Sequence, residues 1–311
     1  MAGKLMRNVG LGIKEEVTYG TDIVPTSADN SILARVSDAQ PASTEFAERN
    51  IVRSYLGSNG QVAVSNHSEI TVEFELAGTA AAGDVPGWAP LLKACGFGET
   101  IVAATSVTYK PISTAFKSVS VYYWLDGLLH KMVGCMGTPS FSLNSRGIPV
   151  VSVKLTGLYS AVSDVTLPTD FDYSAFLAPK AVNKVNTTAF TLHGTTAPFD
   201  TLSIDGGNNV VYRNMPGLEE VIITDRKVTG SISIQMTTVA AKAWHDTAIS
   251  GTLAGLSMTH GATAGQIFTI TAPKVQLTNP QYADKDGVVM LNLGLDFQPN
   301  AGNDELSIAI T

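Results

Sequence analysis

Alternation of apolar and polar residues in two distant parts of the chain constrains the fold more than any other feature. Residues 147–161 read GIPVVSVKLTGLYSA, and residues 287–299 read GVVMLNLGLDFQP. In the first stretch Val151, Val153 and Leu155 alternate with polar residues, and the second stretch repeats the pattern. A period of two residues is typical of a strand with one face buried. Both stretches are therefore predicted to be strands.

The surroundings of the two stretches repeat as well. An alternating segment comes earlier in each half, ITVEFEL at 70–76 and SISIQM at 231–236. A short helix with one Trp and a terminal Gly is then predicted at 86–96 in the first half and at 237–251 in the second. The order of elements is the same in both halves. The chain is therefore predicted to contain two copies of one strand–helix–strands unit.

Other segments of the two halves can be matched more loosely. In the first half, a long hairpin is predicted at 118–134, with a type I′ turn at Asp126-Gly127. The matched pairs are 99–111 with 251–261, 118–134 with 266–278, and 34–50 with 200–214. The last pair is predicted to form an extended hairpin or loop that projects from the core of each unit.

The predicted domain organisation follows from this repeat. Residues 1–165 form a first unit with an N-terminal arm, and residues 186–311 form a second. Residues 166–185 are rich in proline and polar side chains without a clear period, which is typical of a linker. The fold class is mainly β with short helices, in two tandem units.

Composition restricts the functions that such a chain can have. Hydrophobic residues make up 44%, which is enough for a core, whereas charged residues make up only 15%. The net charge of −7 argues against general, sequence-independent binding of nucleic acid, which needs clustered Lys and Arg. Cys95 and Cys135 are predicted to be free thiols, with one disulfide as the alternative. Neither a secretory signal nor a membrane span is expected.

No catalytic or metal-binding pattern stands out. The five histidines are dispersed, and His245 and Asp246 are neighbours that would face different directions on a helix. Asp284-Lys285-Asp286-Gly287 resembles the start of a calcium loop but lacks its later ligands, and it equally suits a hairpin turn. We therefore expect no enzymatic activity, no cofactor and no required metal.

The N-terminal part of the chain resembles the phage tail tube (major tail) proteins. In that family a Gly-x-x-x-Glu-x-x-Tyr-Gly-Thr run is followed by Pro and a polar stretch. A Gly/Ala-rich loop that leads to a short helix and Ala-Cys-Gly, here residues 75–100, is also similar to the family. The matching residues of the first motif are Gly12, Glu16, Tyr19, Gly20, Thr21 and Pro25.

This resemblance implies a structural virion protein of a long, non-contractile tail. Each unit would be a small β-sandwich or half-barrel with one flanking helix, and oligomerisation would complete a β-barrel around a channel. Rings stack into a tube that carries DNA, with a tape measure protein inside and tail terminator and tail tip (initiator) proteins at the ends. The tube would be assembled in the host cytoplasm, without a membrane. Two units per chain predict a trimeric ring with pseudo-sixfold symmetry, with a hexamer as the alternative.

The resemblance also implies which side chains line the channel. If the apolar residues of the alternating strands face the core, the polar ones face the lumen. A charge-poor or acidic wall would let DNA slide without binding. The expected lumen residues are Thr71, Glu73, Glu75, Ser152, Lys154, Ser231, Ser233, Gln235, Asn292 and Asp296, with Lys154 paired to a neighbouring acid.

A different class of function is a carbohydrate-binding or adhesin-like β module of a virion. Such a module needs an aromatic platform on one face. Aromatic residues make up only 7% of this chain, and Tyr122, Tyr123 and Trp124 are consecutive, so they should point to alternate faces of a strand. The tail tube therefore remains the first hypothesis.

Overall fold

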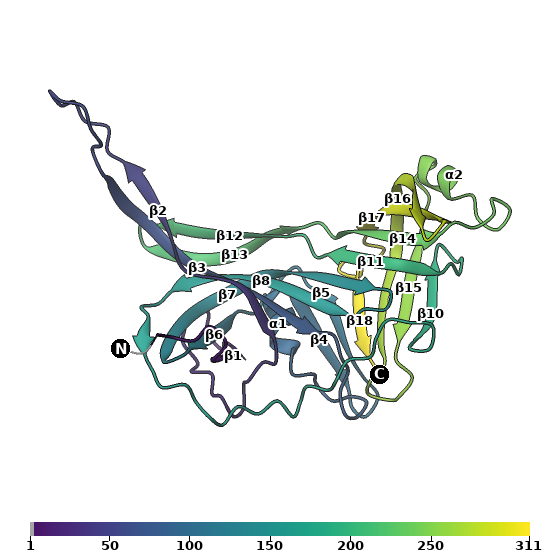
Figure 1. Cartoon of the computed structure of the whole chain (residues 1–311), viewed down its shortest axis with the longest axis horizontal. Helices are drawn as coiled ribbons and strands as arrows, with labels where there is room; N and C mark the ends of the chain where they lie inside the picture. Colours follow the sequence, from purple (N-terminus) through teal and green to yellow (C-terminus); the bar gives the residue numbers. More distant parts are fainter. Residues whose placement is uncertain (1–2) are drawn as a thin grey trace.

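The structure is a computed structural model that describes residues 3–311 (Figure 1). The first half holds one helix, α1 (Ala89–Ala94), and the second half holds another, α2 (Trp244–Ile249). The strands of the first half are β1 (Val9–Glu15), β2 (Arg35–Glu48), β3 (Gln61–Glu75), β4 (Phe97–Val102), β5 (Ser106–Pro111), β6 (Val119–Leu125), β7 (Leu128–Asn144), β8 (Val150–Tyr159) and β9 (Ser163–Asp164). The strands of the second half are β10 (Thr187–Leu192), β11 (Phe199–Asp205), β12 (Asn208–Met215), β13 (Leu218–Arg226), β14 (Thr229–Gln235), β15 (Leu253–His260), β16 (Phe268–Lys285), β17 (Val288–Gln298) and β18 (Ser307–Ile310). The chain is mainly β, as the alternation predicts.

Strands of the two halves pair in the same order. In the first half the order is β1-β6-β7-β8-β3-β2, and in the second it is β10-β15-β16-β17-β14-β11. Every pairing is antiparallel. A short strand follows β8 in the first half and β17 in the second. The first of these, β9, pairs with β7, and the second, β18, pairs with β16. The two helices occupy matching places, α1 after β3 and α2 after β14.

Two strand pairings join the halves into one 16-stranded sheet. At the first joint, residues 140–144 of β7 pair with residues 201–205 of β11. At the second, β5 pairs with β18 at the chain's C-terminal end. Residues 165–186 between β9 and β10 contain no helix or strand, but they lie against the first half, where the ring of Phe171 meets that of Trp124 edge to face at 5.6 Å. The predicted unit boundary in this segment stays a prediction.

The core is built from the apolar positions of the alternating strands. Ile70, Val72 and Phe74 of β3 are at most 2% exposed. Both helix tryptophans are buried with them, and the indole N–H of Trp88 donates to the carbonyl of Ala77 at 3.0 Å. Burial of one large apolar side chain contributes about 1.5–3 kcal/mol, so this repeated apolar face is the main source of stability.

The helices are shorter than predicted. Just before α1 the chain makes an i→i+3 hydrogen bond, from Ala89 N–H to Pro86 C=O at 3.0 Å. Before α2 a separate turn at 238–242 is interrupted by Ala243, whose ψ of 77° lies outside the helical region. The helix ends were predicted correctly, because Gly96 and Gly251 follow the helices with φ of 73° and 63°.

Each half contains a long hairpin, which lies beside β8 in the first half and beside β17 in the second. In the first half β2 and β3 form an arm that projects from the body of the molecule (Figure 1). In the second half the hairpin of β11 and β14 continues into β12 and β13, which lie along the first half instead of projecting (Figure 1). The expected projecting segment near 34–50 is therefore confirmed, whereas the one near 200–214 folds back on its own chain.

Two of the looser segment matches were wrong. Residues 251–261 were matched with 99–111, but β15 takes the place of β6, and β4 and β5 have no counterpart among the strands described in the second half. Residues 266–278 were matched with the hairpin at 118–134, but they are only the first part of β16, the counterpart of β7. Strand partners are set by contacts far apart in sequence, which the local alternation does not encode.

Candidate functional site

The ten polar residues that were expected to line a channel lie on one face of the sheet. Pairing places residues that face each other across strands on the same side. Glu73 of β3 lies opposite Ser152 of β8, and Ser233 of β14 lies opposite Asn292 of β17. The remaining six lie an even number of positions from these four residues along the same strands, so they share the same face; they are Thr71, Glu75, Lys154, Ser231, Gln235 and Asp296. None of the ten is fully buried.

This polar face continues across the joint between the halves. One row of directly opposed residues runs from β3 to β16 without interruption. Its members are Glu73, Ser152, Ser140, Asp205, Thr229, Asp296 and Gln276. The middle of the row was not predicted, although the alternation of Ser140, Phe141, Ser142 and Leu143 in the sequence could have revealed it.

Charges on the polar face are partly neutralised by ion pairs. Arg35 binds Glu73, with 2.5 Å between the guanidinium and the carboxylate. The ammonium of Lys154 lies 3.0 Å from the carboxylate of Glu69, so the expected pairing of Lys154 with a neighbouring acid is confirmed. Each exposed pair contributes less than about 1 kcal/mol, because water and salt screen it. Glu75 is exposed and Asp296 half-buried, and neither forms an ion pair within residues 3–311.

The pairing order of the sheet ends at an unpaired edge of β2. Along residues 35–48 this strand pairs with β3 on one side only, considering the part of the chain that the structure describes. The far end of β16 is similar, because residues 281–285 pair with β17 alone within residues 3–311. Tyr282 at this end is 64% exposed, beside Val289 at 53%. Unpaired edges with apolar side chains are typical of surfaces that receive another strand.

The N-terminal motif builds a buried hydrogen-bond network. Glu16 is 4% exposed, and its carboxylate accepts bonds from the hydroxyls of Ser118 at 2.6 Å and Ser120 at 2.8 Å. The backbone N–H groups of Gly20 and Gly134 donate to the same carboxylate, both at 2.8 Å. Four donors on one carboxylate fasten the segment after β1 to β6 and β7. The motif glutamate therefore has a structural role.

Tyr19 of the same motif reaches the second half of the chain. Its hydroxyl accepts a hydrogen bond from the N–H of Val221 in β13. Burial raises the pKa of Tyr19 to about 12, so the hydroxyl stays neutral at physiological pH. The contact helps to hold the β12–β13 hairpin against the first half.

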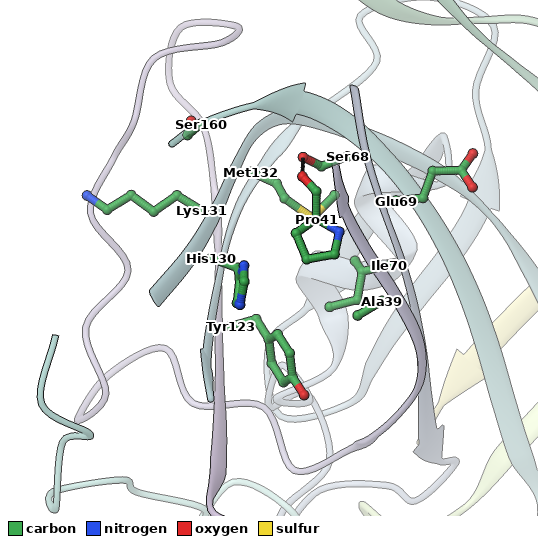
Figure 2. Close-up of a pocket in the computed structure, with 10 residues that line it drawn as sticks. All are labelled: Ala39, Pro41, Ser68, Glu69, Ile70, Tyr123, His130, Lys131, Met132 and Ser160. Atoms are coloured by element: carbon green, nitrogen blue, oxygen red, sulfur yellow. Dashed lines mark hydrogen bonds between the residues drawn. The ribbon is translucent and has the colours of Figure 1, made fainter. Parts of the chain in front are cut away.

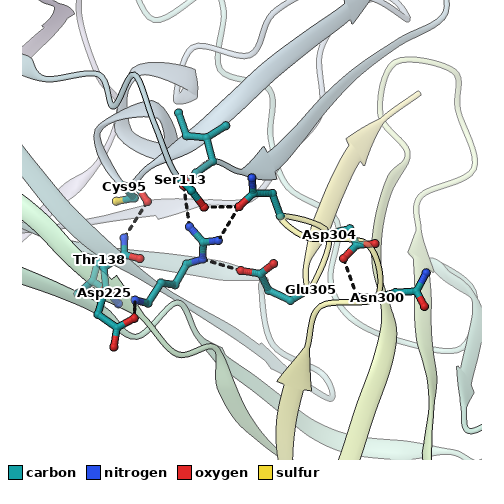
Figure 3. Close-up of polar contacts among 11 residues, drawn as sticks. Cys95, Ser113, Thr138, Asp225, Asn300, Asp304 and Glu305 are labelled. Carbon is teal, nitrogen blue, oxygen red and sulfur yellow. Dashed lines mark hydrogen bonds and ion pairs between the residues drawn. The ribbon is translucent and has the colours of Figure 1, made fainter.

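A second polar cluster ties β13 to both halves (Figure 3). The Arg226 side chain donates to the Glu305 carboxylate at 2.6 Å and to the carbonyl of Ile112 at 2.8 Å. It also donates to the side-chain oxygen of Asn303 at 3.3 Å, which accepts a bond from Ser113 at 2.5 Å. These bonds join the β5–β6 connection, β13 and the segment before β18, and the second carboxylate oxygen of Glu305, Oε2, is buried without a hydrogen-bond partner among residues 3–311. The arrangement of the cluster is that of a structural clamp.

The recess between the β2–β3 arm and the β6–β7 hairpin is too small for a substrate (Figure 2). Its cavity volume is about 10 Å³, room for one water at most. His130 faces this recess, and burial lowers its pKa, so its imidazole is neutral near pH 7. The hydroxyl of Ser68 is already engaged with the carbonyl of Pro41 at 2.6 Å.

Other expected features can be placed in the structure. Cys95 and Cys135 are free and buried, which confirms free thiols over a disulfide. The aromatic run at 122–124 is at most 7% exposed, so it forms no open platform for a sugar. Asp286 and Gly287 form the turn between β16 and β17, with φ of 55° and 78° as in a type I′ turn.

Metal-ligand clusters and membrane-spanning helices are both absent from residues 3–311. Among residues 3–311, no three His, Cys, Asp or Glu side chains come together as metal ligands. No helix of this part of the chain has the length and apolarity that crossing a bilayer requires.

The chain is similar to a known protein family. A family model described as "Phage tail tube protein" matches residues 6–299, nearly the whole chain. No curated protein matches the chain. The family match extends well beyond the N-terminal segments that carry the resemblance in the sequence.

Proposed function

This chain belongs to the phage tail tube protein family, and we propose that it polymerises as stacked rings into the tube of a long, non-contractile tail. The family is a structural one of the virion tail and not a family of enzymes. The channel of the tube carries DNA into the host. The observation that supports this most directly is the polar face that runs unbroken from β3 to β16 above an apolar core. Such a sheet suits a wall between a packed core and a water-filled lumen.

Each ring contains three chains and has pseudo-sixfold symmetry. The support is the shared pairing order of the two halves, which gives each chain two similar wall segments. Closed rings also use up the free edges of β2 and β16, which would otherwise promote aggregation.

The partners follow from the architecture of a tail. A tape measure protein lies inside the tube during assembly in the host cytoplasm, and tail terminator and tail tip proteins close its two ends. DNA passes without specific binding. The chain's net charge of −7 supports this, because a wall with few free cations does not hold phosphates.

Electron microscopy of the purified full chain tests the proposal. We expect rings or tubes, and a density map with three chains per ring. Six complete chains in a ring would refute the trimer while leaving the tube role intact. A protein that stays monomeric at high concentration and forms no rings would contradict the tube role itself.

A further inference from the structure

We infer that residues 281–285 of β16 form an antiparallel strand pair with residues 35–40 of β2 from a second copy of the chain. This joint has the geometry that already connects the two halves inside one chain. The inference rests on the proposed ring function and assigns the surfaces through which the copies meet.

The template is the joint between β7 and β11. There Phe141 lies directly opposite Ile204. The two side chains are 1% and 0% exposed, so the core passes without a break from one half to the other. The hydroxyl-bearing neighbours Ser142 and Ser203, also directly opposed, carry the polar face across the same joint.

The strand register identifies Tyr282 as the counterpart of Phe141. Ser140 lies opposite Ser152, which lies opposite Glu73, whereas Gln281 lies opposite Asn292, which lies opposite Ser233. The first row thus ends on β3 and the second on β14, which hold the same place in the two pairing orders. Ser140 and Gln281, which begin the two rows, are therefore counterparts, and the residues that follow them are Phe141 and Tyr282.

The strand register also identifies Ala39 as the counterpart of Ile204. Arg35 of β2 and Thr201 of β11 lie opposite the corresponding residues Glu73 and Ser233. Farther along, Ala39 lies opposite Ile70 and Ile204 lies opposite Gly230. Ile70 and Gly230 each lie three residues before those partners, Glu73 and Ser233. The inferred joint therefore places Tyr282 of one copy against Ala39 of the next.

The inferred joint, which has no partner strand within residues 3–311 of one chain, differs from the β7–β11 joint in the exposure of its apolar side chain. Tyr282 is 64% exposed where Phe141 is 1% exposed, although both stand at the same place in their units. An open groove runs beside Tyr282, lined also by Met236 and Val289. A second copy's β2 would cover this groove, and the small Ala39 leaves room for the large tyrosine ring.

The arm of the second copy then has a defined path. Inside one chain, the β12–β13 hairpin continues from β11 and packs Val221 against Met136 of β7. The Tyr212 hydroxyl donates to the carbonyl of Asn66 at 3.0 Å. The β2–β3 arm is the counterpart of that hairpin, and Phe46 and Val62 on it are 55% and 52% exposed. It follows that the arm lies over the second half of the neighbouring copy.

Disulfide cross-linking between copies tests the joint. Protein with Ala39→Cys is mixed with protein carrying Tyr282→Cys, assembled, and treated with a mild oxidant. Directly opposed residues of paired strands lie within disulfide range, so we expect a covalent dimer on a non-reducing gel. Cys95 and Cys135 are 0% exposed and contribute no cross-link. Mixing two single variants ensures that any dimer joins different copies.

The control shifts one partner by a single residue. Gln40→Cys mixed with Tyr282→Cys should give no dimer, because neighbouring side chains in a strand point to opposite faces. If Tyr282→Cys prevents assembly, Asp38→Cys with Ala283→Cys tests the next opposed pair. Rings that form without either cross-link overturn the joint and leave the tube role standing. Absence of rings in the unmodified protein overturns both.

Discussion

At the scale of single residues, the N-terminal motif is explained by the network around Glu16. We expect Glu16→Ala to lower the free energy of unfolding by about 3 kcal/mol or more, because buried donors lose a charged acceptor. Ser120 is 0% exposed and Gly134 donates from within β7, so water cannot replace the carboxylate without opening the packing. Urea denaturation of the purified protein measures the loss.

Glu16→Gln provides the matched comparison. The amide keeps the shape and one oxygen acceptor, and the serine hydroxyl beside its NH₂ group, Ser118 or Ser120, can rotate to accept from it, so that only one backbone N–H loses its acceptor. It should therefore destabilise clearly less than Glu16→Ala. The exposed Glu75→Ala should change stability by less than about 0.5 kcal/mol. Equal losses for Glu16→Ala and Glu75→Ala would contradict the structural role of the motif.

Residue-level features were predictable where they depended on local alternation. All ten polar residues fall on one face because parity along a strand decides which side a residue takes. The ion pair of Arg35 with Glu73 was missed, since it needs the register of β2 against β3. The Glu16 network was missed for a similar reason, because three of its four donors are about a hundred residues away along the chain.

At the scale of elements, the turn between β16 and β17 gives a clean test of backbone conformation. Gly287 has φ of 78°, and a Cβ added there would meet no atom within 4 Å. Gly287→Ala should therefore cost about 1 kcal/mol through the backbone alone. Gly287→Asn should cost less, because Asn tolerates the left-handed region. Thermal unfolding of the three proteins measures the order, and a loss for Asn equal to that for Ala would contradict it.

Element identity was predicted well, but element partners were not. The strands at 70–76, 150–159 and 288–298 follow from period two, and the turn at Asp126-Gly127 has φ of 43° and 88°, as the sequence indicated. The match of β15 with β6 was missed because β4 and β5 interrupt the order in the first half alone. Only the pairing of strands reveals which elements correspond.

At the scale of the whole molecule, the polar face suggests how a tube wall would treat DNA. Glu73 is a poor choice for changing that wall, since Glu73→Lys would set a second cation against Arg35 and disturb the β2–β3 pairing. Glu75 is exposed and Asp296 half-buried, and both lie on the same face without an ion pair among residues 3–311. They are therefore the better probes.

We predict that phage carrying Glu75→Lys with Asp296→Lys assembles tails but ejects its genome more slowly. Lysines repeated around a ring and along a tube would bind the phosphates of passing DNA, and raising the salt concentration should restore part of the rate. Asp84→Lys with Asp164→Lys changes the net charge equally at exposed positions outside this face, so it should eject at the normal rate. Ejection kinetics measured for both variants decide the matter. If the two variants eject alike, the polar face is not the wall that DNA meets.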